Sequence, residues 1–155
     1  TAEGAIQVAM EETTYTISDL NVLVLGFGRV GKTLANKLKS LCSNVYVEAR
    51  KPTDLAWINA YGYIGIDLQD LPNNLCKMDI IFNTVPEMIL DKSKLILISK
   101  DALLVELASK PYGIDFEVAE KLGIKTKIAS ALPGKVAPDT AAKYIIEYIY
   151  RMLKI

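Results

Sequence analysis

The sequence predicts an α/β fold, a doubly wound parallel six-stranded sheet with helices on both faces. Two observations support this prediction. First, short apolar runs alternate with amphipathic segments along most of the chain, which is typical of parallel strands joined by right-handed crossover helices. Second, one such run leads through three closely spaced glycines into an amphipathic segment, as the first unit of such a sheet does. The 155 residues, 51% of them apolar, are enough for one domain with a core.

The first elements follow from the spacing of apolar residues. Residues 1–14 predict a leading or linker helix, because small and apolar side chains recur there at helical spacing. The run NVLVL at 21–25 predicts a strand covered on both faces. Residues 30–41 predict a helix with a leucine-rich face opposite lysines. We therefore expect a single domain over 15–155, preceded by the leading helix.

The alternation continues to the C-terminus. Further strands are predicted at 44–50, 63–66, 78–86, 102–107 and 124–130, with helices at 53–62, within 67–77, at 115–123 and from Pro138 onward. Strands in this sequence favour the spatial order 3-2-1-4-5-6. In the last helix we interpret the tyrosines and isoleucines as core residues rather than a contact between copies of the chain: Tyr144, Ile145, Ile146, Tyr148, Ile149 and Tyr150.

Charge and hydropathy exclude two classes of partner. The chain has 18 basic and 18 acidic residues, so no broad electrostatic field draws it to nucleic acid or to a membrane surface. Its apolar runs fall well short of the roughly 20 residues that cross a bilayer, and no secretory signal opens the chain. We therefore expect a cytoplasmic protein that binds neither nucleic acid nor membrane.

The cysteines do not predict a site. Cys42 and Cys76 lack the spacing of a zinc site or of a disulfide framework, and the chain has no histidine. We expect two buried, reduced core cysteines and no metal site. Without an imidazole, any acid–base chemistry must use other residues or another chain. The chain also begins at Thr1 without a methionine, which suggests a cut fragment or a trimmed N-terminus.

The glycines at 26, 28 and 31 predict a dinucleotide-binding turn of the Rossmann fold, because a strand precedes them and a helix follows. Gly26 would allow the sharp turn, Gly28 would let the backbone approach a pyrophosphate, and Gly31 would let helix and strand pack closely. The phosphates would lie at the positive end of the helix, beside the intervening Phe27, Arg29 and Val30. The alternative is that these glycines serve packing alone.

The end of the second strand indicates which dinucleotide is bound. An NAD-binding protein usually has an acidic residue there, whereas this chain has Ala49, 18 positions after Gly31, followed by Arg50, Lys51 and Thr53. A small residue beside an arginine favours the 2′-phosphate of NADP. Strand alternation predicts that Glu48 points to the other face. We favour NADP and keep NAD as possible; the alternative for these residues is a solvated loop.

Three later loops meet at the carboxyl edge of the predicted sheet, where ligands bind in such folds. Residues near the nicotinamide are expected from each of them: Asn83, Thr84, Val85 and Pro86; Ala108, Ser109 and Lys110; Leu132, Pro133 and Gly134. Each loop taken alone is equally well explained as a turn. Lys110 and Lys135 are the candidates for binding substrate carboxylates, and no catalytic residue is identified.

Six segments together resemble the C-terminal half of one family, that of the dipicolinate synthase large (A-type) subunits: TAEGAIQ (1–7), LVLGFGRVGKTLA (23–35), AR (49–50), NTVP (83–86), ELASKPYGIDFE (106–117) and LPGKVAPDTA (132–141). The last three are more specific than the glycines. The resemblance implies NADP-dependent oxidation of dihydrodipicolinate to dipicolinate in the mother cell of a sporulating bacterium. It also implies that the partner is a flavoprotein-like B-type chain of the synthase, and we expect a homo-oligomer.

Two departures from the family matter. The N-terminal half, which should carry the catalytic domain and complete the substrate cleft, is absent, so we expect the chain alone to be inactive. Tyr112 also stands before Gly113 where a glycine pair is expected. Two other functions stay open: a nucleotide-sensing regulatory domain, which Ala49 disfavours, and the cofactor domain of another dehydrogenase for sugars, 2-hydroxyacids or amino acids.

Overall fold

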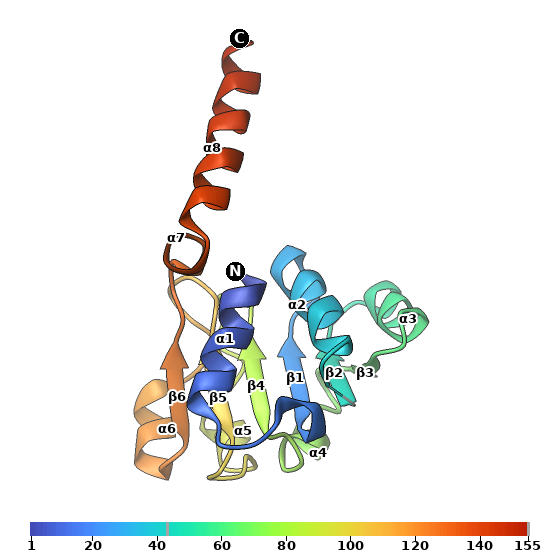
Figure 1. Ribbon diagram of the computed structural model, residues 1–155. Coiled ribbons are helices and arrows are strands. Elements are labelled where there is room, and N and C mark those ends of the chain that lie inside the picture. The colour runs from blue at the N-terminus through green and yellow to red at the C-terminus, as the bar shows by residue number, and fades with distance from the viewer. Residues whose placement is uncertain (43, 155) are drawn as a thin grey trace.

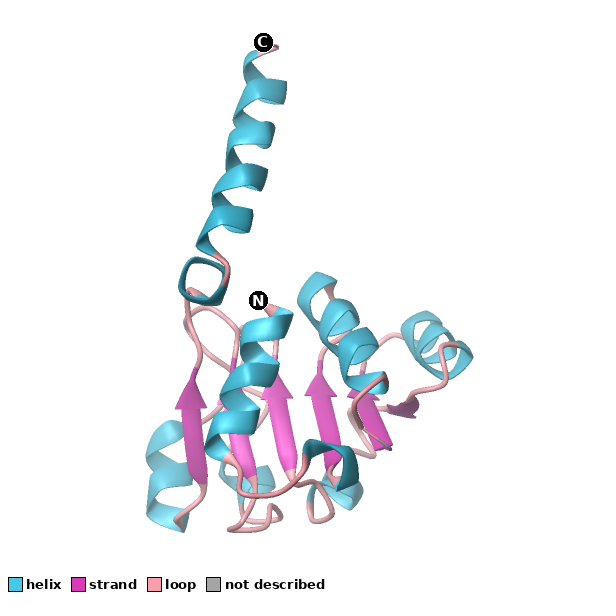
Figure 2. Ribbon diagram, in the orientation of Figure 1, coloured by secondary structure: helices cyan, strands magenta, loops and turns pink. Residues whose placement is uncertain are grey.

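The computed structural model describes residues 1–42 and 44–154. Six parallel strands form one sheet in the order β3-β2-β1-β4-β5-β6, as the parallel arrows of Figure 2 show. The predicted doubly wound fold and strand order are both confirmed. The strands are β1 (Asn21–Leu25), β2 (Asn44–Glu48), β3 (Ile64–Ile66), β4 (Ile80–Asn83), β5 (Leu103–Glu106) and β6 (Lys125–Ile128).

Alternating side chains of the central strands supply two separate cores, one on each face of the sheet. Val22 and Val24 of β1 belong to one apolar cluster, and Leu23 and Leu25 to the other. The helices on the first face are α1 (Ala2–Glu12), α2 (Arg29–Lys39) and α3 (Pro52–Ala60). Those on the second are α4 (Pro72–Leu75), α5 (Lys92–Leu95) and α6 (Phe116–Leu122). This double cover explains why the strands are apolar throughout rather than alternating.

The leading helix α1 packs closely on the domain. Its small residues are buried in the first cluster, and Gly4 fits against Leu132 and Val136 of α7 (Leu132–Val136). A β-carbon added to Gly4 would lie 2.9 Å from a methyl of Val136. The short helix η1 (Ile17–Asp19) then leads into β1. The short helices η1 and α7, together with α5, were not predicted from the sequence.

The interpretation of the last helix as core is wrong for this chain. Helix α8 (Pro138–Leu153) has no buried residue, and Figure 1 shows it leaving the domain as a single extended helix. Its exposed large apolar side chains are Tyr144, Ile145, Ile146, Tyr148, Ile149, Tyr150, Met152 and Leu153. Within the described residues, no helix is long and apolar enough to span a membrane.

The prediction for the cysteines is half right. Both thiols are free, but only Cys42 is buried, whereas Cys76 is exposed after the short helix α4. Burial raises the pKa of the Cys42 thiol to about 11. Cys76 was assigned to the core because its segment was expected to be a longer helix with an inward face.

Candidate coenzyme-binding site

The glycine turn between β1 and α2 requires glycine at two of its three positions. Gly26 has φ +92°, and its N–H donates to the carbonyl of Glu48 at 3.1 Å. A β-carbon on Gly31 would lie 2.1 Å from the carbonyl oxygen of Gly26, which is an impossible contact. The turn therefore brings helix and strand together as the sequence predicted.

Gly28 differs from its neighbours because nothing in the described structure crowds it. A β-carbon built there meets no described atom within 4 Å, and the residue is exposed. Gly28 is also the N-cap of α2, and no side chain of the described residues caps this helix end. The N–H groups of the first turn thus face an open space that an anion can enter, at the positive end of an eleven-residue helix.

A pocket of about 380 Å³ lies beside this turn. It is lined by seven residues predicted to bind the coenzyme, namely Gly26, Phe27, Gly28, Ala49, Arg50, Lys51 and Val85. Three further lining residues were not predicted: Lys32, Glu48 and Asp54. Helical spacing could have suggested Lys32, since it lies in the first turn after the glycines. The pocket joins the two features that the sequence treated separately, the glycine turn and the end of β2.

Glu48 is the most unusual member of this lining. It is 1% exposed, and among the described residues its Oε1 has no hydrogen-bond partner. Burial raises the pKa of Glu48, although the charge of Arg50 and the Gly26 N–H act in the opposite direction. Val47 and Ala49 belong to one core cluster and Tyr46 to the other, so the alternation that sets Glu48 apart from Ala49 is present. Glu48 nevertheless lines the pocket, because it is the last residue of its strand.

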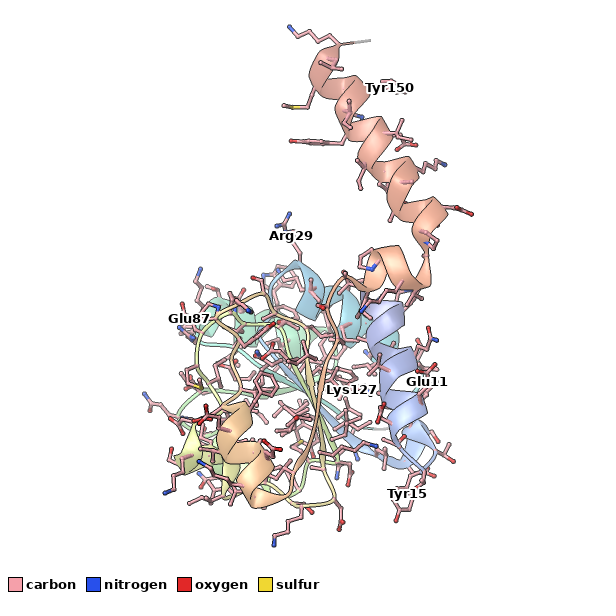
Figure 3. All side chains as sticks on the ribbon, turned by 90° about the vertical axis from the view of Figure 1, so that its left-hand side faces the viewer. Glu11, Tyr15, Arg29, Glu87, Lys127 and Tyr150 are labelled. Atoms are coloured by element: carbon pink, nitrogen blue, oxygen red, sulfur yellow. The ribbon has the colours of Figure 1, made fainter. Side chains whose placement is uncertain are left out.

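Arg50 reaches across the pocket rim. Its Nη2 donates to Oε2 of Glu87 at 2.8 Å, and both side chains are exposed. Glu87 follows β4, and Figure 3 shows it near the edge of the domain. The sequence did not single out Glu87, because only the strand order brings it beside Arg50.

Three predicted residues near the turn have side chains outside the pocket. Arg29 and Val30 line a separate hollow with Thr1, and Figure 3 shows Arg29 pointing away from the domain. Their backbone still forms the first turn of α2. Thr53 is exposed at the start of α3, beyond Lys51. The contribution of these residues to binding is therefore limited to the backbone or to the rim.

The loops after β4 and β5 are held together by a buried network. Asn83 donates from Nδ2 to both carboxylate oxygens of Glu106, at 2.7 and 3.0 Å. Glu106 also accepts from the backbone N–H groups of Ala108 and Gly113, both at 2.9 Å. Burial raises the pKa of Glu106, while these hydrogen bonds oppose that rise. The expectation that the Asn83 side chain faces the coenzyme is wrong, since it is fully buried and bonded internally.

Tyr112 occupies the backbone conformation for which a glycine was expected. Its φ is +69°, in the left-handed region, and its ring packs edge-on against Phe116 with centroids 5.6 Å apart. Gly113 cannot carry a side chain, because a β-carbon would lie 2.4 Å from Nδ2 of Asn83. The loop also contains a cis peptide bond between Lys110 and Pro111. Glycine at one position and aromatic packing at the other therefore maintain the same turn.

The remaining predicted residues lie at the carboxyl edge of the sheet but outside the pocket. Thr84 donates its hydroxyl to the carbonyl of Leu25 at 2.7 Å and so ties β4 to the glycine turn. Leu132 is buried against α1, so its side chain is a core residue rather than a coenzyme contact. The others are exposed or half-buried around this edge: Pro86, Ala108, Ser109, Lys110, Pro133, Gly134 and Lys135.

Comparison with known proteins agrees with this geometry. Residues 2–110 match the family described as D-isomer specific 2-hydroxyacid dehydrogenase, NAD binding domain. The chain belongs to this family. It is therefore a nicotinamide-dinucleotide-binding domain of the dehydrogenase type, and the glycine turn is its characteristic element.

Individual relatives identify the branch of the family. The chain is 40% identical over 153 residues to the A-type polypeptide of dipicolinate synthase from Bacillus subtilis, covering 99% of this chain and 52% of the relative. The crystal structure of that Bacillus subtilis protein matches with a TM-score of 0.96, over 99% of this chain and 51% of the other. The corresponding protein from Bacillus halodurans matches at 38% identity with a TM-score of 0.95, over 98% and 52%.

The resemblance seen in the sequence is confirmed, and this domain is that of a protein like the A-type polypeptide of dipicolinate synthase. The chain spans about half the length of these relatives. A more distant relative is the shikimate dehydrogenase (NADP(+)) of Pyrococcus abyssi, 28% identical over 106 residues that cover 66% of this chain and 39% of the relative.

Proposed function

We propose that this domain binds NADP and serves an enzyme that oxidises dihydrodipicolinate to dipicolinate. The observation that carries the coenzyme part is the open space at Gly28, at the uncapped start of α2 and beside Arg50. Free N–H groups bind the pyrophosphate there, and the Arg50 guanidinium with the Lys51 ammonium binds the 2′-phosphate. The similarity to the A-type polypeptide of dipicolinate synthase supports the choice of reaction.

The nicotinamide, when bound, accepts the hydride that leaves the substrate ring. The loops after β4, β5 and β6 surround the carboxyl edge of the sheet and hold the nicotinamide end of the coenzyme. Lys110 and Lys135 are exposed at that edge and can bind the two carboxylates of the substrate. A second domain, in the half of the relatives that this chain does not span, completes the cleft. No residue of this chain is assigned to catalysis.

The assembly is also part of the proposal. The similarity to one polypeptide of a synthase supports a flavoprotein-like B-type chain as its partner, in the cytoplasm of the mother cell during sporulation. The exposed apolar side chains of α8 support association between copies of the chain. The nucleotide-sensing function and a different dehydrogenase substrate are the alternatives, and activity toward dihydrodipicolinate with the partner present separates them from our proposal.

NAD is the alternative coenzyme, and one specific observation favours it. The buried Glu48 lines the pocket, and its Oε1 can accept a hydrogen bond from a ribose hydroxyl. The family description also names NAD. Against this, a carboxylate close to a 2′-phosphate is unfavourable only while it is ionised, and burial raises the pKa of Glu48. The Arg50 side chain therefore decides between the two coenzymes.

Calorimetric titration with NADP and NAD tests the coenzyme assignment. We expect Arg50→Ala to weaken NADP binding by about tenfold and to leave NAD binding unchanged, because one charge-assisted contact to phosphate is lost. Arg151→Ala, which removes an exposed arginine on α8, is the matched control and should change neither affinity. Equal losses for both coenzymes would remove the 2′-phosphate clamp from the proposal.

A further inference from the structure

The Arg50–Glu87 ion pair spans the carboxyl end of β1. Arg50 follows β2 and Glu87 follows β4, and β1 lies between these strands in the sheet. The glycine turn that leaves β1 thus lies between the two loops that the ion pair connects. Arg50 lines the pocket together with that turn, so its partner affects the same space.

Glu87 places a negative charge where the proposed coenzyme would bring another. The guanidinium of Arg50 bonds to Glu87 through Nη2 at 2.8 Å. A 2′-phosphate seeking the same guanidinium must displace this carboxylate or lie close to it, and like charges repel. NAD carries a hydroxyl in place of that phosphate, so it meets no such repulsion. The side chains of Arg50 and Glu87 are 49% and 65% exposed, so the pair can exchange partners without unfolding the loops.

We propose that Glu87 is a specificity-determining residue that competes with the 2′-phosphate of NADP for the guanidinium of Arg50. This inference rests on the proposed coenzyme function and adds to it a residue that lowers the preference for NADP. The lysines at the rim, Lys32 and Lys51, have no carboxylate assigned to them in the described structure, so Glu87 acts through Arg50. Substitution of Glu87 therefore strengthens NADP binding, which is the opposite of what removal of a ligand contact does.

The test is a calorimetric double-mutant cycle with NADP and NAD on the wild-type chain, Glu87→Gln, Arg50→Gln and the double variant. Glu87→Gln should tighten NADP binding about threefold to tenfold and NAD binding less than about twofold, because only NADP carries the repelled phosphate. In the Arg50→Gln background the gain should fall below about twofold. Added salt should reduce the gain, since the charges are exposed.

Glu3→Gln is the matched control. Glu3 is also an exposed glutamate in an ion pair, with Lys37 at 2.9 Å on the helical face of the domain, and its substitution should leave both affinities unchanged. The inference is overturned if Glu87→Gln leaves NADP binding unchanged or weaker, if NAD gains equally, or if the gain persists without Arg50. If the wild-type chain binds neither coenzyme, the proposed function fails together with it; binding without an effect of Glu87 overturns this inference alone.

Discussion

Gly28 and Gly31 belong to the same turn but have different surroundings, which makes them a matched pair for a test. An alanine methyl at Gly28 would meet no described atom within 4 Å, whereas one at Gly31 would overlap the carbonyl of Gly26. We expect Gly28→Ala to keep the melting temperature within about 2 °C and to weaken NADP binding by about tenfold or more, because the methyl occupies the space of the pyrophosphate.

Gly31→Ala should instead lower stability, by about 1–3 kcal/mol, because helix and strand must move apart. Thermal unfolding and calorimetric titration of both variants measure the two effects separately. If Gly28→Ala binds NADP as tightly as the wild type, the open space at Gly28 does not accommodate the phosphates, and the coenzyme site must be placed elsewhere.

At the scale of single residues, the sequence predicted the backbone better than the side chains. The glycine turn and the Ala49–Arg50 pair line one pocket because their positions depend on local chain geometry. Asn83 was misassigned because its partner, Glu106, lies 23 residues away on the neighbouring strand. The Arg50–Glu87 contact was missed for the same reason, since no local pattern encodes a contact between loops after two different strands.

At the scale of elements, Glu12 connects the end of α1 to the edge strand β6. Its carboxylate pairs with Lys125 at 2.8 Å and with Lys127 at 2.6 Å. Hydrogen bonds from these two lysines lower the pKa of Glu12 from 4.5 to about 2. A carboxyl group whose pKa is lower in the folded state stabilises that state above its unfolded pKa, and the contribution is lost as the pH falls through the folded value.

We therefore expect Glu12→Gln to lower the melting temperature at about pH 6–7, with the difference from the wild type shrinking between about pH 4.5 and about pH 2. Glu11→Gln is the control, because Glu11 is exposed on the same helix and bonds within it to Gln7. Calorimetry across this pH range measures the difference. A difference that stays constant with pH, or that appears equally in Glu11→Gln, would contradict the role of the two lysines.

Elements were predictable where they are long or carry strong signals. The strands β1, β2, β4 and β5 are apolar on both faces, and α6 has Asp115 as its N-cap and Gly123, with φ +73°, after its last residue. The helices α5 and α7 have only four and five residues, too few for a periodic apolar face to be recognised. Their positions depend on contacts with distant parts of the chain, such as α7 with α1.

At the scale of the whole molecule, α8 is the element that this chain leaves without cover. Thr140, Lys143, Glu147 and Arg151 recur every three or four residues and form one polar stripe, so apolar residues occupy most of the remaining circumference. Periodicity alone could not show whether this apolar surface packs on the chain's own sheet or on a partner. An exposed apolar surface of this size is typical of an interaction site.

We expect the chain to self-associate through α8, and Ile145→Gln combined with Ile149→Gln to weaken that association. The side chains are 60% and 46% exposed, so the melting temperature of the domain should change by less than about 2 °C. Lys143→Gln combined with Arg151→Gln alters the polar stripe equally often and should affect association less. Sedimentation velocity over a range of concentrations measures the effect. A wild-type chain that is monomeric throughout would exclude self-association, because exposed apolar residues that attract a second copy must do so increasingly as concentration rises.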